Sequence, residues 1–167
     1  MSLSMHAASV PAFVRQLGAM LVWLDKAQAH AEARKFSPDS YLGLRLAPDM
    51  LPFSKQIQIA SDGAKGCVAR LAGEEIPKWD DTEVTLDDLR ARIRKTIDYV
   101  QSVPAAEVDG SESREIVLQM RVGDPRRYVG QAYLTQYVLP NFYFHATTAY
   151  ALLRQAGVDV GKRDFLG

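Results

Sequence analysis

Apolar residues recur every three or four positions over four long stretches of the chain, which is the spacing that buries one face of an amphipathic helix. The stretches cover about residues 4–33, 52–72, 85–103 and 130–156. Each is long enough to pack against its neighbours along several turns. The pattern therefore predicts an all-α protein built on a four-helix bundle.

Residues with special backbone roles stand at the ends of these stretches. Gly73 and Gly157 occupy the positions where glycine commonly ends a helix. Thr85 and Asp88 have the spacing of a capping box, with Asp in the usual place of Glu, so they predict the start of the third helix. Pro140 lies inside the fourth stretch, where it lacks the amide that would bond to residue 136, and it predicts a kink there.

The segments between the helices differ in character. Residues 34–51 contain Ser-Pro and Ala-Pro steps and leave room for one short helical turn. Residues 116–121 alternate in polarity, and the turn at 122–125 would let residues 126–129 return antiparallel as a small β-hairpin. The tail at 158–167 is too rich in glycine and charge to continue the last helix. We expect one domain, residues 1–167: an up-down bundle with a long crossover and a hairpin before the last helix.

The charge balance excludes some classes of function. Twenty basic residues offset twenty acidic ones, so the formal net charge is zero. Without a basic block, the chain has no electrostatic drive toward nucleic acid or an anionic membrane surface. A net charge near zero makes association easier, which is compatible with a homo-oligomer.

The composition also indicates a compartment. Cys67 is the only cysteine, so no disulfide can form within the chain, which is typical of a reducing compartment. The N-terminal sequence has no secretory signal pattern, and the run LGAMLVWL is too short to span a bilayer. These features predict a cytoplasmic protein.

Polar side chains interrupt the predicted inward face of the last helix. At about 100° per residue, Asn141 and His145 fall in the middle of this stripe, where a burial without partners would cost about 1–3 kcal/mol. Gln56 on the flank of the second helix is the best candidate partner, and Gln58 lies on its more exposed side. The stripe contains Leu134, Val138, Asn141, His145, Ala149 and Leu152.

Two interpretations of this polar group stay open. It is either a satisfied cluster that fixes the register of the helices or the lining of a site. His6, on the inward stripe of the first helix, and Thr148 are further candidates for the same site. A zinc or nickel site would need more nitrogen ligands than His145 alone, because an amide at position 141 is a poor ligand for such metals.

Three segments together resemble a known family. They are MSLSM…ASVPAFVRQLG, DMLPFSKQIQIASDGAKG…RLAG and LPNFYFHATTAYALLRQAGVDVGKRDFLG. The chain is similar over its whole length to an uncharacterised branch of the DinB/YfiT-like superfamily, domain-of-unknown-function family nineteen-ninety-three. The resemblance implies the same four-helix bundle, frequently as a homodimer.

The resemblance also implies where a metal would bind in better-studied members, which carry a His triad for a divalent metal. His145 matches one triad position and Asn141 another, while the third falls near Gln56 or Gln58. The helical wheel favours Gln56, since a ligand must face inward. Only one of the three positions keeps His, so we predict no metal site and no other cofactor.

Three functions follow as hypotheses. The preferred one is a bundle whose polar pocket, lined by Gln56, Asn141 and His145, binds a small molecule without metal. The second is a divalent-metal or thiol-dependent transferase or isomerase with a replaced ligand set that recruits His6. The third is a non-catalytic homodimer that uses the small-residue face of the second helix or the GKRDFLG tail as an interface.

Overall fold

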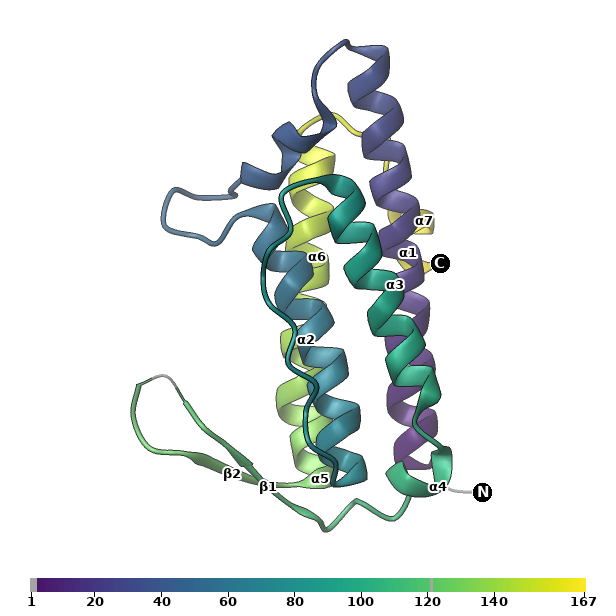
Figure 1. Cartoon of the computed structure of the whole chain (residues 1–167), viewed down its shortest axis with the longest axis vertical. Coiled ribbons are helices and arrows are strands. Elements are labelled where there is room, and N and C mark those ends of the chain that lie inside the picture. The colour runs from purple at the N-terminus through teal and green to yellow at the C-terminus, as the bar shows by residue number, and fades with distance from the viewer. Residues whose placement is uncertain (1–2, 121) are drawn as a thin grey trace.

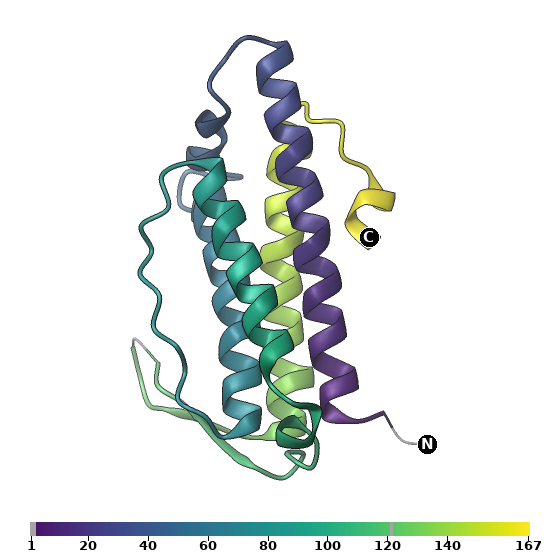
Figure 2. The same ribbon diagram turned by 45° about the vertical axis from the view of Figure 1, so that its right-hand side comes forward.

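The structure is a computed structural model that describes residues 3–120 and 122–167, and it confirms the predicted all-α bundle. Its long helices are α1 (Met5–Ala33), α2 (Phe53–Ala72), α3 (Leu86–Ser102) and α6 (Leu139–Gln155). In Figure 1, α1 and α6 run upward while α2 and α3 both run downward. A long crossover, residues 73–85, connects α2 to α3 along the outside of the bundle (Figure 2).

The predicted helix boundaries match the local chemistry at the ends of the helices. The side chain of Ser4 accepts a hydrogen bond from the amide of Ala7 and caps α1. Thr85 and Asp88 form both bonds of the capping box that begins α3. Gly73 ends α2 with φ = 79°, in the left-handed region where a side chain would strain the backbone.

The connections include the predicted small elements and one short helix that the sequence pattern did not indicate. The hairpin pairs β1 (Glu115–Leu118) antiparallel with β2 (Arg126–Val129), and Glu115 lies opposite Val129. The expected extension of the first strand includes Arg121, which lies outside the described residues. The predicted turn after α1 is the 3₁₀ helix η1 (Pro38–Gly43), and a short helix, α4 (Ala105–Val108), follows α3.

The first helix is long and apolar enough, by length and composition, to cross a membrane. In the structure its apolar stripe, including Phe13, Leu17 and Leu24, is fully buried. The stripe packs against the other helices of the bundle, as expected of the core helix of a water-soluble fold.

The last helix begins irregularly, and this broadens the predicted inward stripe, of which every residue but Asn141 is buried. Between α5 (Gly130–Ala132) and α6 lies the π-helical segment η2 (Tyr133–Val138), where the amide of Leu139 bonds to the carbonyl of Leu134. The π turn inserts about one residue, so the residues after it are rotated by about 100° from a regular wheel. The buried side of α6 therefore includes Phe142, Ala146 and Leu153 beside the predicted His145, Ala149 and Leu152, and Asn141 is only partly buried.

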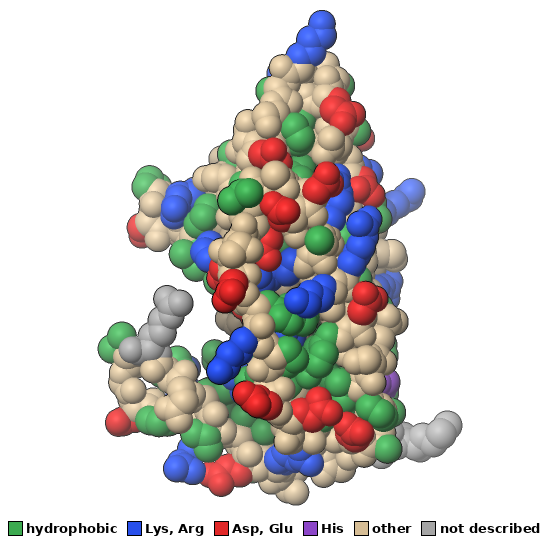
Figure 3. All heavy atoms as spheres, viewed as in Figure 1, with side chains coloured by type: hydrophobic (Ala, Val, Ile, Leu, Met, Phe, Trp, Pro, Cys, Tyr) green, Lys and Arg blue, Asp and Glu red, His purple; other side chains and the backbone are tan. Residues whose placement is uncertain are grey.

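The crossover is held against the bundle by a buried arginine. Arg92 contacts Glu83 and Asp81 of the crossover at 2.8 and 3.0 Å, and Asp62 of α2 at 3.0 Å. Burial alone would lower the pKa of Arg92, but these carboxylates outweigh it and raise the pKa, so the guanidinium stays charged. Basic and acidic side chains are interspersed over this face (Figure 3).

The C-terminal tail leaves the last helix, as predicted, but it then forms a further short helix, α7 (Lys162–Leu166). α7 lies beside α1 (Figure 2). Phe165 stacks on Trp23 at 5.5 Å with an interplanar angle of 14° and meets the edge of Tyr150 at 5.6 Å. The indole N–H of Trp23 donates to the carbonyl of Asp164 at 2.9 Å. The tail therefore packs against helices of its own chain.

We predict that Phe165→Ala lowers the free energy of unfolding by about 2 kcal/mol, because it removes a half-buried ring from this aromatic stack. Leu166→Ala is the matched control, since Leu166 is exposed and should change stability by no more than about 0.5 kcal/mol. Urea unfolding followed by tryptophan fluorescence measures both. Equal losses in the two variants would show that the stack does not hold the tail.

Candidate functional site

The second helix presents two polar flanks to different neighbours. Gln56 and Gln58 are two residues apart, so their side chains leave the helix about 200° apart. Gln56 contacts α6, whereas Gln58 contacts the crossover. Both side chains are buried, and the two glutamines therefore belong to separate polar groups.

His145 and Gln56 form one of these groups. The Nδ1 atom of His145 lies 2.7 Å from Oε1 of Gln56, while Nε2 of Gln56 donates to the carbonyl of Leu51 at 2.8 Å. Because the amide oxygen can only accept, Nδ1 of His145 must carry the hydrogen. The pair is satisfied in the neutral state, and burial lowers the pKa of His145 below its ordinary value.

Gln58 belongs to the cluster around Arg92. Its Nε2 atom donates to Glu83 at 2.7 Å, and the same carboxylate accepts from Arg92. Gln58 is 3% exposed, and its Oε1 atom has no hydrogen-bond partner among the described residues. This glutamine helps to fix the crossover and does not lie with His145.

The two remaining candidates are also separate from the pair. His6 lies in the first turn of α1, at the lower end of the bundle in Figure 1, where its backbone amide donates to Asp109 beside α4. α2 begins in the upper half, so His6 is far from Gln56. The hydroxyl of Thr148 donates to the carbonyl of Phe144, one turn earlier in α6, at 2.8 Å.

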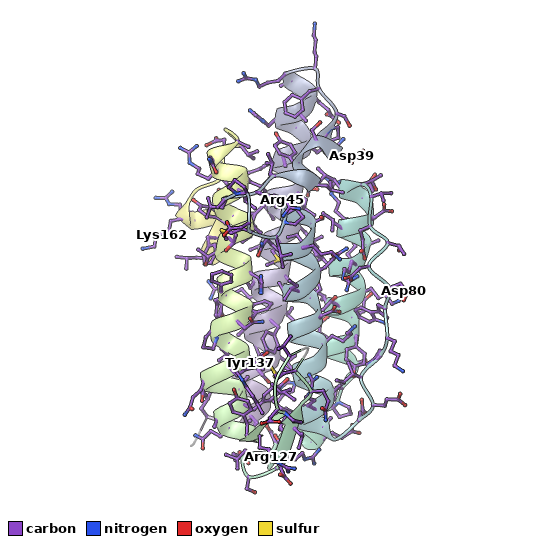
Figure 4. All side chains as sticks on the ribbon, turned by 90° about the vertical axis from the view of Figure 1, so that its left-hand side faces the viewer. Asp39, Arg45, Asp80, Arg127, Tyr137 and Lys162 are labelled. Carbon is purple, nitrogen blue, oxygen red and sulfur yellow. The ribbon has the colours of Figure 1, made fainter. Side chains whose placement is uncertain are left out.

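Asn141 faces a cavity of about 210 Å³ between α2, the hairpin and the start of the last helix. In Figure 4, Tyr137 marks this place, between α6 and α2 with the hairpin in front. His145 and Gln56 do not line the cavity. The lining residues include Ile59, Asp62, Gly63 and Arg70 of α2, Leu118, Gln119 and Met120 at the end of β1, and Tyr133, Tyr137, Val138 and Asn141.

These residues do not fit the metal triad that the resemblance implies. Two of the three positions carry amides, which are poor ligands for zinc or nickel. Gln56 and His145 already use one atom each on the other, and Asn141 faces a different space. Among residues 3–120 and 122–167, no three His, Cys, Asp or Glu side chains are grouped closely enough to hold a metal ion.

Sequence reasoning missed the residues that give the cavity its character. Arg70 and Tyr133 are joined by a hydrogen bond of 3.1 Å from Nη1 to the phenol oxygen. Tyr133 stacks on Tyr137 at 6.1 Å with an interplanar angle of 18°, and Tyr128 lies close to both. The available signal was the close spacing of Tyr128 in β2 with Tyr133 and Tyr137 just after the hairpin, but assigning them to a cavity requires the position of α2.

We predict that His145 makes stability depend on pH. Its folded pKa is lowered, so between the unfolded value of about 6.5 and the folded value the unfolded chain binds more protons. The free energy of unfolding should therefore fall as pH decreases from 7 through this window. His145→Gln, which can still donate to Gln56, should flatten the profile, as measured by urea unfolding at several pH values. Identical profiles for the two proteins would contradict the buried neutral imidazole.

Comparison with known proteins agrees with this architecture. Residues 5–166 match the family described as "Domain of unknown function (DUF1993)". The crystal structure of a DinB family member protein from Shewanella denitrificans is 38% identical and superimposes with a TM-score of 0.88, covering 97% of this chain and 91% of that one. No curated protein matches significantly. The chain belongs to the DUF1993 family, an uncharacterised branch of the DinB-like superfamily.

Proposed function

We propose that this protein binds a small molecule in the cavity beside Asn141 and does so without the metal triad of its superfamily. The observation that carries the proposal is the cavity itself, which opens between α2 and η2 and combines aromatic, apolar and polar side chains. Such mixed, concave linings are typical of ligand sites. A π-helical turn at its wall supports the same view, since π turns are frequent at functional sites.

The cavity replaces the pocket that the sequence predicts. Of the three residues expected to line it, Asn141 contributes to the cavity, while Gln56 and His145 bond to each other. We assign that pair a structural role that fixes α6 against α2. The side chain of Asn141 makes no hydrogen bond with a described residue, so its amide is free to contact a ligand in the cavity.

A metal- or thiol-dependent enzyme has less support. Beyond the poor ligand set, Cys67 is completely buried, and burial raises the pKa of its thiol far above the ordinary range. A thiol in this state is not a nucleophile. We place the protein in the cytoplasm, where a lone buried cysteine stays reduced.

A cavity-filling variant tests the proposed site. Gly63 lines the cavity, and a Cβ atom added there meets nothing within 4 Å. We predict that Gly63→Leu blocks ligand entry while leaving the fold intact, because replacing a helical glycine is worth up to about 1 kcal/mol of stability. A fragment screen by ¹H–¹⁵N NMR should find compounds that shift the amides of α2 and η2 in the wild type and not in Gly63→Leu.

The screen has a clear negative outcome and a metal control. Fragments that shift the same amides equally in both proteins, or none at all in the wild type, would rule out this cavity as the binding site. Elemental analysis of untagged protein should show no stoichiometric zinc or nickel. Stoichiometric metal that disappears in His145→Ala would favour the metalloenzyme alternative.

The outer face of α6 supports a second proposal, a homodimer. From Tyr128 to Leu153 the chain has no Asp, Glu, Lys or Arg, although 24% of all residues are charged. Phe144 is 56% exposed and Leu46 beside it 49% exposed, and together with Tyr143 they line an apolar hollow of about 420 Å³. Exposed apolar patches commonly mark interaction sites, and a two-fold axis would place the same uncharged face on both copies. We infer that two copies pair through this face.

We predict that Phe144→Lys converts the dimer into a monomer, because two lysines would meet across the two-fold axis without partners. Size-exclusion chromatography with light scattering at micromolar concentration measures the mass. Val22→Lys is the control, since Val22 is 46% exposed on α1, away from α6's outer face. A monomeric wild type would refute the pairing.

A further inference from the structure

We propose that the cavity beside Asn141 selects a small anion, a carboxylate on a planar apolar body, and that Arg70 carries the recognition of its charge. The inference rests on the proposed function and specifies its ligand class. Four features of the lining support it. They are hydrogen-bond donors that the protein does not use, an acidic group that is paired with cations, an aromatic wall and the space that Gly66 leaves for the guanidinium.

Arg70 has donor capacity that the protein does not use. Its Nη1 atom donates to the carbonyl of Gly66 and to the hydroxyl of Tyr133, both at 3.1 Å. Nη2 and Nε have no hydrogen-bond partner, and no carboxylate of the described chain pairs with the guanidinium. A half-buried arginine without a counter-ion, facing a cavity, is suited to a bidentate bond with a carboxylate.

Two neighbours also offer hydrogens. Tyr133 is 2% exposed and accepts from Arg70, so its own O–H is left without an acceptor in the described chain. Burial raises the pKa of Tyr133, which keeps this hydrogen in place. The amide of Asn141 makes no hydrogen bond with a described residue. These unpaired hydrogen-bond donors around Arg70 favour a ligand that carries several hydrogen-bond acceptors.

One acidic side chain lines the same cavity, and a free carboxylate there would repel an anionic ligand. Asp62 is paired through Oδ1 with Lys65 at 2.8 Å and with Arg92 at 3.0 Å. Arg92 also pairs with Asp81 and Glu83, so Lys65 is the cation that mainly offsets Asp62, and both cations are buried. The field at the cavity is set by the unpaired charge of Arg70.

The wall of the cavity suits a flat, apolar ligand body. Tyr137 stacks on Tyr133, and Ile59, Leu118 and Met120 add apolar surface. A volume of about 210 Å³ is below the roughly 300–1,000 Å³ typical of drug-sized ligands, so it matches a single ring with one acidic group.

The sequence leaves room for the guanidinium at one position. A Cβ atom added at Gly66 would lie 2.7 Å from Nη1 of Arg70, which is too close for both to stay in place. Glycine at 66 therefore lets Arg70 fold back along α2 toward Tyr133. Gly66→Ala should displace the charge without removing it.

The test compares benzoate with its neutral isostere benzamide by ¹H–¹⁵N NMR titration of the wild-type protein. Benzoate should shift the amides of residues 63–70 and 133–141, with an affinity at least about tenfold higher than that of benzamide. Arg70→Gln and Gly66→Ala should each weaken benzoate by at least about tenfold, while Arg94→Gln, an exposed arginine on α3, should have no effect. The dispersion of each spectrum shows whether the variant is folded.

The outcomes separate this inference from the proposed function. Equal binding of both compounds, blocked by Gly63→Leu but insensitive to Arg70→Gln, would overturn the anion and leave the small-molecule site standing. Benzoate shifts that persist in Gly63→Leu would place binding elsewhere and overturn both. If neither compound binds at millimolar concentration, the aromatic carboxylate is refuted, and the fragment screen alone decides the cavity.

Discussion

The missing amide of Pro140 constrains the whole α2–α6 side of the bundle. A regular helix would need that amide to bond to Gln136, and the π turn of η2 directly before it absorbs the irregularity. The turn rotates everything after it by about one residue. Phe142 thereby enters the core, His145 meets Gln56 and Asn141 turns toward the hairpin. The pair and the cavity both depend on this local change in register.

The two flanks of α2 differ in whether their charged side chains are paired. Toward α3 and the crossover, Arg92 gathers carboxylates and is almost fully compensated. Toward α6 there is no charged residue from Tyr128 to Leu153, and the one cation on that side of α2, Arg70, has no counter-ion in the described chain. The first flank has a structural role, because breaking a buried ion cluster costs free energy of folding. The second flank leaves hydrogen-bond donors available for a ligand.

Much of the fold was predictable because helical periodicity and caps are local properties. Thr85 with Asp88, Gly73 and Gly157 define helix ends through bonds and dihedral angles within a few residues. The site was less predictable because it depends on a rotation and on partners distant in sequence. A constant 100° wheel placed Asn141 and His145 on one inward stripe, but only the position of α2 and the hairpin shows that His145 meets Gln56 while Asn141, one turn earlier, lines the cavity. The same wheel favoured Gln56 over Gln58 as the partner of His145. That prediction is correct, because α2 is a regular helix throughout.

Gln56, Asn141 and His145 stand at the positions that the resemblance assigns to a His triad, and their side chains offer a different chemistry. Gln56 and His145 satisfy each other as a donor and an acceptor, so they close the upper part of the α2–α6 contact. Asn141 cannot join them, because it lies a full turn away on the side of Arg70 and Tyr133. The hydrogen-bond donors that no described residue uses are therefore concentrated around Arg70, Tyr133 and Asn141. We infer that binding at this face depends on these donors and not on the positions that the resemblance assigns to the triad.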